Sequence, residues 1–329
     1  MNRGGAVADQ LSVAVTGAGG YVGSRLVGML VARPDTTVRA LIRRPAPVPE
    51  GAEVVTGDLL RDDGALDRLC GGADVVVHLA GPNEVEAERD PERAVAEVVS
   101  GTLRLAEAIS RSGVRRAIYV STVHVYGARM RPGVAVDEDT PCEPRSPYAV
   151  ARLAAEHLLA SQSGVPLVVL RLTNAVGAPA ATTIERWSLV ANDLCRQGAT
   201  TGRLVLRTHG AQSRDFVALS DVGEIIARMC VPLSIEAGTY NLGSGAPMSV
   251  RGLAGLVQDA FADLTGCRPD LEAPPAPPGM PPAAPLVSIA RLSAAGFSAT
   301  TPLREAVTET ARFCLDHRAE LVPQHNERP

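Results

Sequence analysis

The sequence contains no lysine, since all 32 of its basic residues are arginine. Because lysine is missing along the whole chain of 329 residues, which is also rich in glycine and proline, we interpret the absence as a bias in composition. The 36 acidic residues bring the net charge to −4. This balance provides no electrostatic reason to expect a nucleic-acid partner, although local arginine clusters remain able to hold phosphates.

Other absences exclude further classes of protein. No apolar run reaches the roughly 18 residues that a membrane span requires, and residues 1–10 lack the apolar segment of a secretion signal. The six cysteines form no CxxC pair and show no ligand spacing. We therefore expect idle thiols, no metal site, no membrane partner and a cytoplasmic protein.

Short apolar runs alternate with amphipathic segments through the first half of the chain. The expected strands are Leu11–Val15, Val38–Ile42, Glu53–Val55, Val75–Leu79, Ala117–Ser121 and Leu167–Leu172. The expected helices are Tyr21–Val31, Asp62–Cys70, Glu92–Ser112 and Pro147–Ser161. Strands that alternate with helices of this length predict βαβ crossovers, and hence an α/β fold with a doubly wound parallel sheet of the Rossmann type.

The pattern changes after about Val176, which predicts a second, smaller region. We expect a flexible N-terminus at residues 1–10, a Rossmann domain at 11–176, and a mainly substrate-binding lobe at 177–329. Segments around 215–235 are expected to return to the Rossmann domain. Helices are expected near Glu185–Arg196 and Val222–Met229. The proline-rich stretch Ala273–Pro285 predicts an extended connection, because proline fixes φ and removes a donor.

The segment TGAGGYVG, at residues 16–23, follows the first expected strand and opens the first expected helix. Its glycines allow a tight turn, a close approach of backbone to a pyrophosphate, and close packing of helix on sheet. The N-terminus of the helix then offers N–H groups to the phosphates. The residues expected to bind a dinucleotide here are Gly17, Gly20, Tyr21, Val22 and Gly23.

The second strand ends in Arg43 and Arg44, where an acidic residue is typical of a cofactor with free ribose hydroxyls. Guanidinium groups suit a 2′-phosphate, which they bind through paired hydrogen bonds. We therefore expect NADP(H), with NAD(H) as the alternative if both arginines are simply solvated surface residues.

Several motifs along the chain together resemble those of the extended short-chain dehydrogenase/reductase family. This family includes nucleotide-sugar epimerases, dehydratases and ketoreductases, and the resemblance covers nearly the whole length of the chain. The motifs that carry the resemblance are TGAGGYVG (16–23), GDL (57–59), HLAG (78–81), STVHVYG (121–127), YAVAR (148–152), RLTNAVGAP (171–179), RDFVALSDV (214–222) and YNLGSG (240–245). The resemblance implies further cofactor contacts from Asp58, Leu59, Leu79, Ala80, Gly81, Tyr148 and Arg152.

The resemblance also assigns catalytic roles to Thr122, Tyr148 and Arg152. Tyrosine is a poor base at neutral pH, but a fixed cation at i+4 lies on the same helical face and favours the phenolate. Thr122 is expected to orient the same substrate oxygen. Arg152 stands where the family has lysine, and Val98 stands where the family has asparagine. Three interpretations stay open: activity retained under the lysine-depleting bias, altered chemistry, or a catalytically idle binding protein.

Substrate contacts are expected, by resemblance, from His124, Asn174 and Arg214. Structural roles remain the alternative: Asn174 follows a buried strand, and His124 can pack beside Tyr126. The two positions after Thr122 lack the Asp-Glu pair of sugar dehydratases, so dehydration is disfavoured.

Together these features predict an NADPH-dependent ketoreductase that acts on a nucleotide-diphosphate keto sugar or deoxysugar, in secondary-metabolite or glycan sugar biosynthesis. A nucleotide-sugar 4-epimerase with tightly bound NAD is the first alternative. A catalytically idle NADP-binding protein is the second. The family resemblance also implies a homodimer.

Overall fold

The computed structural model describes residues 10–275 and 286–322, and it divides into two compact units. Of the described residues, unit 1 takes 10–127, 142–171 and 223–240. Unit 2 takes 128–141, 172–222, 241–275 and 286–322. Residues 1–9 of the expected flexible N-terminus and residues 276–285 of the proline-rich stretch lie outside the described residues.

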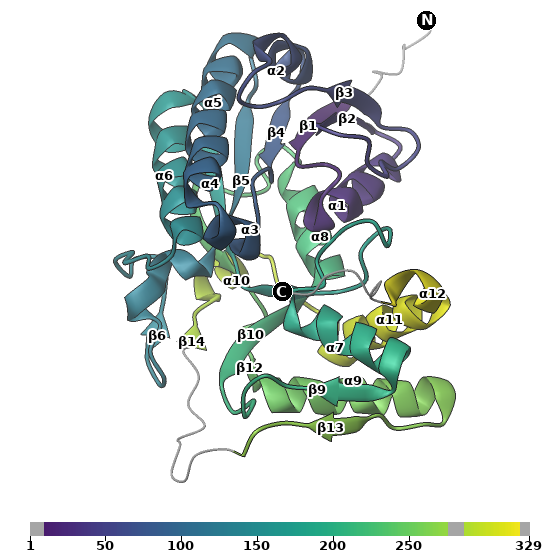
Figure 1. The fold of residues 1–329 in the computed structure, drawn as a ribbon. Coiled ribbons are helices and arrows are strands. Elements are labelled where there is room, and N and C mark those ends of the chain that lie inside the picture. Colours follow the sequence, from purple (N-terminus) through teal and green to yellow (C-terminus); the bar gives the residue numbers. More distant parts are fainter. Residues whose placement is uncertain (1–9, 276–285, 323–329) are drawn as a thin grey trace, which may run out of the picture. The chain divides into compact units, whose positions relative to one another are not determined.

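Unit 1 is built on a seven-stranded sheet with the order β11-β7-β5-β4-β1-β2-β3 (Figure 1). Its strands are β1 (Leu11–Thr16), β2 (Thr36–Ile42), β3 (Glu53–Thr56), β4 (Val75–His78), β5 (Arg116–Thr122), β7 (Leu167–Leu172) and β11 (Gly238–Leu242). The pairings of β1 with β2 and β4, of β2 with β3, and of β4 with β5 are parallel. The order reverses direction beside β1, so the predicted doubly wound Rossmann-type sheet is confirmed.

Helices cover both faces of this sheet. They are α1 (Tyr21–Val31), α2 (Asp63–Cys70), α3 (Glu84–Arg89), α4 (Pro91–Val95), α5 (Gly101–Ser112), α6 (Pro147–Gln162) and α8 (Leu219–Met229). Figure 1 shows α2, α5 and α6 along one face, and α1 and α8 along the other. The expected helix over 92–112 is interrupted: a π-helical turn, Ala96–Ser100, joins α4 to α5. Such turns are frequent at functional sites.

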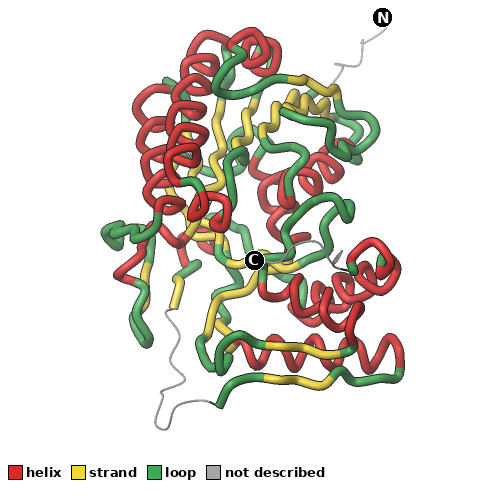
Figure 2. The backbone as a smooth tube through the Cα atoms, viewed as in Figure 1, coloured by secondary structure: helices red, strands yellow, loops and turns green. Residues whose placement is uncertain are grey.

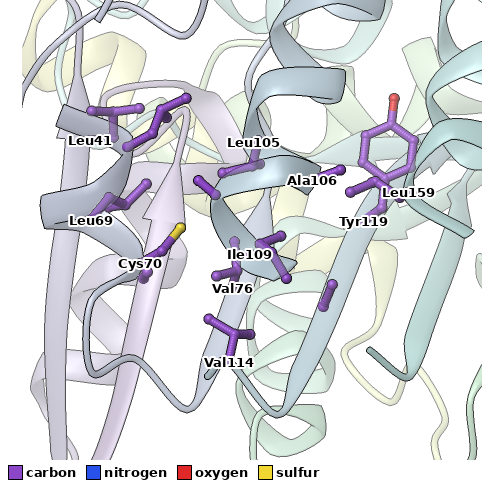
Figure 3. Packing of buried hydrophobic residues seen from close by; sticks show 14 of the residues in the cluster. Leu41, Leu69, Cys70, Val76, Leu105, Ala106, Ile109, Val114, Tyr119 and Leu159 are labelled. Carbon is purple, nitrogen blue, oxygen red and sulfur yellow. The ribbon is translucent and has the colours of Figure 1, made fainter. Parts of the chain in front are cut away.

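An apolar cluster fills the space between the sheet and helices α2, α5 and α6 (Figure 3). All four residues of β4 are buried, as expected for a strand covered on both faces. Each fully buried Val, Leu or Ile side chain contributes about 1.5–3 kcal/mol to folding. Figure 3 also shows Tyr119 at the edge of this cluster, with its hydroxyl directed away from the other labelled residues. The cluster thus fixes the strands whose carboxyl ends carry the candidate site.

Unit 2 combines short strands with a helical core. Its elements are β6 (Ala135–Val136), β8 (Asn174–Val176), α7 (Val190–Thr201), β9 (Arg203–Val205), β10 (Ser213–Ala218), β12 (Pro247–Ser249), α9 (Val250–Thr265), β13 (Asp270–Glu272), β14 (Leu286–Val287), α10 (Ala290–Ala294), α11 (Leu303–Asp316) and α12 (Arg318–Leu321). Side chains from α7, α9 and α11 share one apolar cluster, and Figure 2 distinguishes these helices from the short strands. Strand β10 pairs parallel with β8 and antiparallel with β12. Within the described part of the chain, no helix is both long and apolar enough to cross a membrane.

Candidate active site

The glycine-rich turn between β1 and α1 leaves no room for side chains at Gly17, Gly19 or Gly23. A Cβ on Gly17, which has φ 68°, would lie 2.8 Å from the backbone nitrogen of Ala80. A Cβ on Gly23 would collide with the carbonyl oxygen of Gly17. The N–H of Gly20 donates to that same oxygen at 2.9 Å, and α1 begins without a side-chain cap. This tight backbone cradle at a helix N-terminus suits the pyrophosphate of a dinucleotide.

The segment after β2 lies directly against this turn, because a Cβ on Gly19 would come within 2.5 Å of the Ala46 Cβ. Arg43 and Arg44 belong to this segment. Arg43 donates to the Glu97 carboxylate at 2.8 Å, and Arg93 donates to the same oxygen at 2.9 Å. Arg44 is exposed and has no ion pair among the described residues. The two arginines therefore differ, since one is already paired and the other is available to an anion.

The turn after β3 contains Asp58 and Leu59, which the resemblance implies as cofactor contacts. The Asp58 carboxylate accepts the N–H of Leu60 at 2.8 Å and so shapes its own turn. Leu59 packs on the start of α5, since its Cβ lies 3.2 Å from where a Cβ on Gly101 would stand. The turn therefore offers an apolar side chain in a fixed position.

A buried polar chain holds the carboxyl ends of β1 and β4 together. His78 lies between two threonine hydroxyls, with Thr16 Oγ1 at 2.7 Å from Nδ1 and Thr102 Oγ1 at 3.0 Å from Nε2. Thr16 Oγ1 also accepts the N–H groups of Leu79 at 3.2 Å and Ala80 at 3.3 Å. Burial, with the nearby charge of Arg152, lowers the pKa of His78 to about 3. The imidazole is therefore neutral, and it positions the backbone of the predicted HLAG segment.

Of the predicted catalytic side chains, Tyr148 and Arg152 lie together at the start of α6, and Thr122 lies at the end of β5. Ser146 caps α6 by accepting the N–H of Ala149 at 3.2 Å. One turn on, the guanidinium carbon of Arg152 lies 5.3 Å from the ring centroid of Tyr148. The Tyr148 ring stands edge-on to His124, with centroids 6.4 Å apart. Thr122 is 4% exposed at the end of β5, and its hydroxyl accepts the N–H of His124 at 3.2 Å.

Arg152 is 6% exposed, and the hydrogen bonds that its guanidinium makes to described residues are both long. Nη1 donates to the Ala80 carbonyl at 3.4 Å and Nη2 to the Pro82 carbonyl at 3.5 Å. The Nε of Arg152 and the hydroxyl of Tyr119 are buried and find no partner among the described residues. Burial opposes the charge of Arg152, but the phenols of Tyr119 and Tyr148 outweigh it and raise its pKa. Arg152 is thus a permanent cation beside both phenols.

A second buried network, which the sequence did not reveal, fixes α6 against β5. Glu156, one turn beyond Arg152, accepts from Ser121 Oγ at 2.5 Å and from Arg171 Nη2 at 2.8 Å. The Arg171 guanidinium also lies 4.9 Å from the Tyr126 ring centroid. Helical spacing is the sequence signal that could have pointed to Glu156, since Tyr148, Arg152 and Glu156 fall at i, i+4 and i+8. This network holds the strand end that carries Thr122 next to the helix that carries Tyr148.

Two of the predicted substrate contacts, Asn174 and Arg214, belong to unit 2. The side-chain amide of Asn174 donates to the Asp215 carbonyl at 2.8 Å, so this nitrogen links β8 to β10. Arg214 is exposed on β10, in register with Met248 of β12. The Asp215 carboxylate accepts N–H groups of Ser244 and Gly245 at 2.8 and 2.7 Å, which fixes the predicted YNLGSG turn. Asp215 is a positioning residue that the motif contained but did not single out.

No group of three or more potential metal ligands occurs in the described parts of the chain. The chemistry available to unit 1 is instead a glycine cradle that fits a dinucleotide, a phenol beside a fixed cation, and a hydroxyl at the end of a strand. These groups can bind a pyrophosphate and transfer a proton to or from an oxygen.

The family model described as "NAD dependent epimerase/dehydratase family" matches residues 13–243. The chain is 34% identical to GDP-6-deoxy-D-mannose reductase of Pseudomonas aeruginosa over 261 residues, which cover 74% of this chain and 78% of the relative. It is 28% identical to dTDP-L-rhamnose 4-epimerase of Burkholderia thailandensis, with coverages of 76% and 81%. Among solved structures, MoeE5 in complex with UDP-glucose and NAD is similar with a TM-score of 0.76 and 27% identity, over 94% of this chain and 99% of that one. UDP-glucose 4-epimerase of Thermus thermophilus in complex with NAD also has a TM-score of 0.76 and 27% identity, over 92% and 99%.

Proposed function

Because the chain belongs to the NAD-dependent epimerase/dehydratase family, within the extended short-chain dehydrogenases/reductases, we propose that it is an NADPH-dependent ketoreductase of nucleotide-linked keto sugars or deoxysugars. The observation that carries this proposal is the position of Arg43 and Arg44, on a segment packed against the glycine turn. A 2′-phosphate beside that turn would meet guanidinium groups and no strand-end acid. The name of the Pseudomonas relative, a deoxysugar reductase, supports the same reaction.

The two regions of the chain are proposed to bind different parts of the reactants. The Rossmann domain over 11–176 binds the cofactor through the glycine turn, the arginine pair, Asp58 and Leu59, and the HLAG backbone. The lobe over 177–329 binds the nucleotide sugar, with Arg214 as one contact. Asn174 and His124 are the other two proposed contacts to the sugar substrate. We also propose that the enzyme works in the cytoplasm as a homodimer, which sedimentation of the purified protein would test.

In the proposed reaction, NADPH when bound supplies the hydride that reduces the carbonyl carbon. Tyr148 donates its phenolic proton to the carbonyl oxygen, and the hydroxyl of Thr122 orients that oxygen through a hydrogen bond. Arg152 stabilises the phenolate that remains, because its charge persists at every working pH. No carboxylates follow Thr122 to act as acid and base, so elimination of water is not part of the proposal.

A 4-epimerase that retains NAD is a second candidate, and one observation favours it. The Glu97 carboxylate already neutralises Arg43 at 2.8 Å, which leaves Arg44 as the free cation for a 2′-phosphate. The two solved structures described above contain NAD. An epimerase would return the hydride within one turnover and consume no cofactor.

Two measurements on the purified protein separate these candidates. The first is to denature the protein with acid and identify any released dinucleotide by mass. The second is to follow dihydronicotinamide absorbance with keto sugars linked to GDP, dTDP or UDP. Stoichiometric NADPH consumption supports the reductase. Tightly bound NAD with interconversion of 4-epimers and no net oxidation would replace it.

A catalytically idle NADP-binding protein would behave differently from both candidates. In that case Arg152→Lys would leave turnover at zero with every sugar, although NADPH would still bind. An enzyme that is slowed by its arginine should instead gain activity in this variant, since the shorter cation can then reach the position that the family's lysine takes.

A further inference from the structure

The guanidinium of Arg152 rests on a position where the chain has no side chain. A Cβ built on Gly81 would stand 3.1 Å from Nη2 of Arg152 and 3.3 Å from Cζ. Contacts of 3.0–3.4 Å to a Cβ are tighter than nine in ten such contacts. Any larger residue at position 81 would therefore press directly on the planar head of Arg152.

The backbone on both sides of Gly81 also holds this head. Nη1 donates to the carbonyl of Ala80, and Nη2 donates to the carbonyl of Pro82, so the two hydrogen bonds flank Gly81. Both bonds are long, at 3.4 and 3.5 Å, so a small displacement of the guanidinium would break them. The guanidinium thus lies across a short stretch of backbone whose middle residue has no Cβ.

An apolar wall closes the same space. The Cγ2 atom of Val98 would lie 3.1 Å from the Cβ built on Gly81, and Val98 is 2% exposed in the π-helical turn. A valine here cannot offer a hydrogen bond to the guanidinium, so the position of the head depends on shape and on the two carbonyls. Arg152, Gly81 and Val98 therefore form one packing unit.

This packing has consequences for Tyr148, whose ring lies 5.3 Å from the same guanidinium carbon. Arginine is longer than lysine and carries its charge on a plane, so it needs a flat surface to keep that charge close to a neighbouring group. We propose that Gly81 is a positioning residue that acts through Arg152: the missing side chain lets the guanidinium lie flat beside Tyr148. The consequence for turnover rests on the proposed function, whereas the packing itself does not.

The test is a double-mutant cycle between Gly81→Ala and Arg152→Lys. Gly81 has φ 137°, so alanine adds backbone strain in both backgrounds. Contact with the guanidinium is added only when arginine is present. Gly113→Ala serves as a control for alanine at a positive φ without a steric contact, because Gly113 has φ 76° and a Cβ there would meet nothing within 4 Å. The comparison of the two backgrounds removes the larger strain at φ 137°.

We expect Gly81→Ala to lower the melting temperature by about 2–8 °C, more than Gly113→Ala does. In the R152K background, the loss caused by Gly81→Ala should fall to half or less. On a keto sugar that the enzyme reduces, Gly81→Ala should lower kcat about tenfold or more in the arginine enzyme. The same change should lower kcat less than about threefold in the R152K enzyme. In both backgrounds, the loss of NADPH affinity should parallel the loss of melting temperature and not the loss of kcat.

Equal losses of melting temperature in the two backgrounds would overturn the proposal, because strain alone would then explain the effect. If the single Gly81→Ala variant does not fold, recovery of folding in the double variant supports the proposal. Failure of the double variant, with R152K alone folded, overturns it. If no keto sugar is reduced at all, the proposed function fails, while the melting-temperature cycle still decides whether Gly81 positions Arg152.

Discussion

The pairing of Arg43 with Glu97 makes a quantitative prediction about the choice of cofactor. The Arg43 side chain is 44% exposed and that of Glu97 is 15% exposed, so solvent screens their 2.8 Å contact in part. An ion pair of this kind is worth no more than about 1 kcal/mol. Arg43 must give up part of this energy when it turns to a 2′-phosphate. Glu97→Gln removes the competing charge and should tighten NADPH binding about two- to fivefold, the factor that this energy corresponds to.

The assay is a fluorescence titration of NADPH and NADH into the wild type and the variant at low ionic strength. NADH has no 2′-phosphate, so its dissociation constant should stay unchanged and the preference for NADPH should rise. Added salt should shrink the difference, because exposed charges are screened. Glu92→Gln is the matched control, since Glu92 lies on the neighbouring helix α4 and has no side-chain partner among the described residues. An equal change for both cofactors, or none for either, would refute a role of Glu97 in discrimination.

Three further predictions concern the groups around β5 and α6. Tyr148→Phe should abolish reduction with little change in NADPH affinity, measured by steady-state kinetics and titration; full activity would remove the phenol from the reaction. Glu156→Gln should destabilise the fold by about 3–5 kcal/mol in urea unfolding, because it leaves the buried guanidinium of Arg171 without a counter-charge; a loss below 1 kcal/mol would contradict this. His78 is neutral when folded and protonated when unfolded below pH 6.5, so stability should fall as the pH drops from 6.5 towards 3, by about 1.4 kcal/mol per unit from this group. His78→Gln should remove that slope, and an unchanged slope would show that other groups cause it.

The sheet of unit 1 could be predicted from the sequence because its strands are short β-branched runs between clear helix signals. The runs at 11–15, 38–42 and 75–79 match β1, β2 and β4 to within two residues at either end. The helix expected near Glu185–Arg196 was placed too early, since α7 begins at Val190 and ends at Thr201. Residues before Leu189 form turns instead. Apolar spacing locates a buried helical face, but it marks the start of a helix poorly where no capping side chain precedes it.

Motifs located the side chains of the site but not the partners that hold them. The spacing of Tyr148 and Arg152 predicts a shared helical face, and the structure places their groups 5.3 Å apart. By contrast, the Thr16–His78–Thr102 chain joins residues separated by 62 and 24 positions. No local pattern encodes such a pairing, because it depends on which strand ends become neighbours in the sheet. The roles predicted for the remaining site residues stay predictions.

The absence of lysine is a property of the whole chain, but its effect at position 152 depends on local geometry. A composition bias explains why an arginine stands there, and it does not explain how the larger head is accommodated. The structure shows how the larger head is accommodated, since the guanidinium lies where any Cβ at position 81 would press on it. If the bias in composition alone mattered, the residues at positions 81 and 98 would be expected to vary among related sequences independently of the residue at position 152. The packing argues instead that the three positions are coupled, because a lysine would leave empty part of the space that the guanidinium fills, and a Cβ at position 81 would push the guanidinium by a few tenths of an ångström.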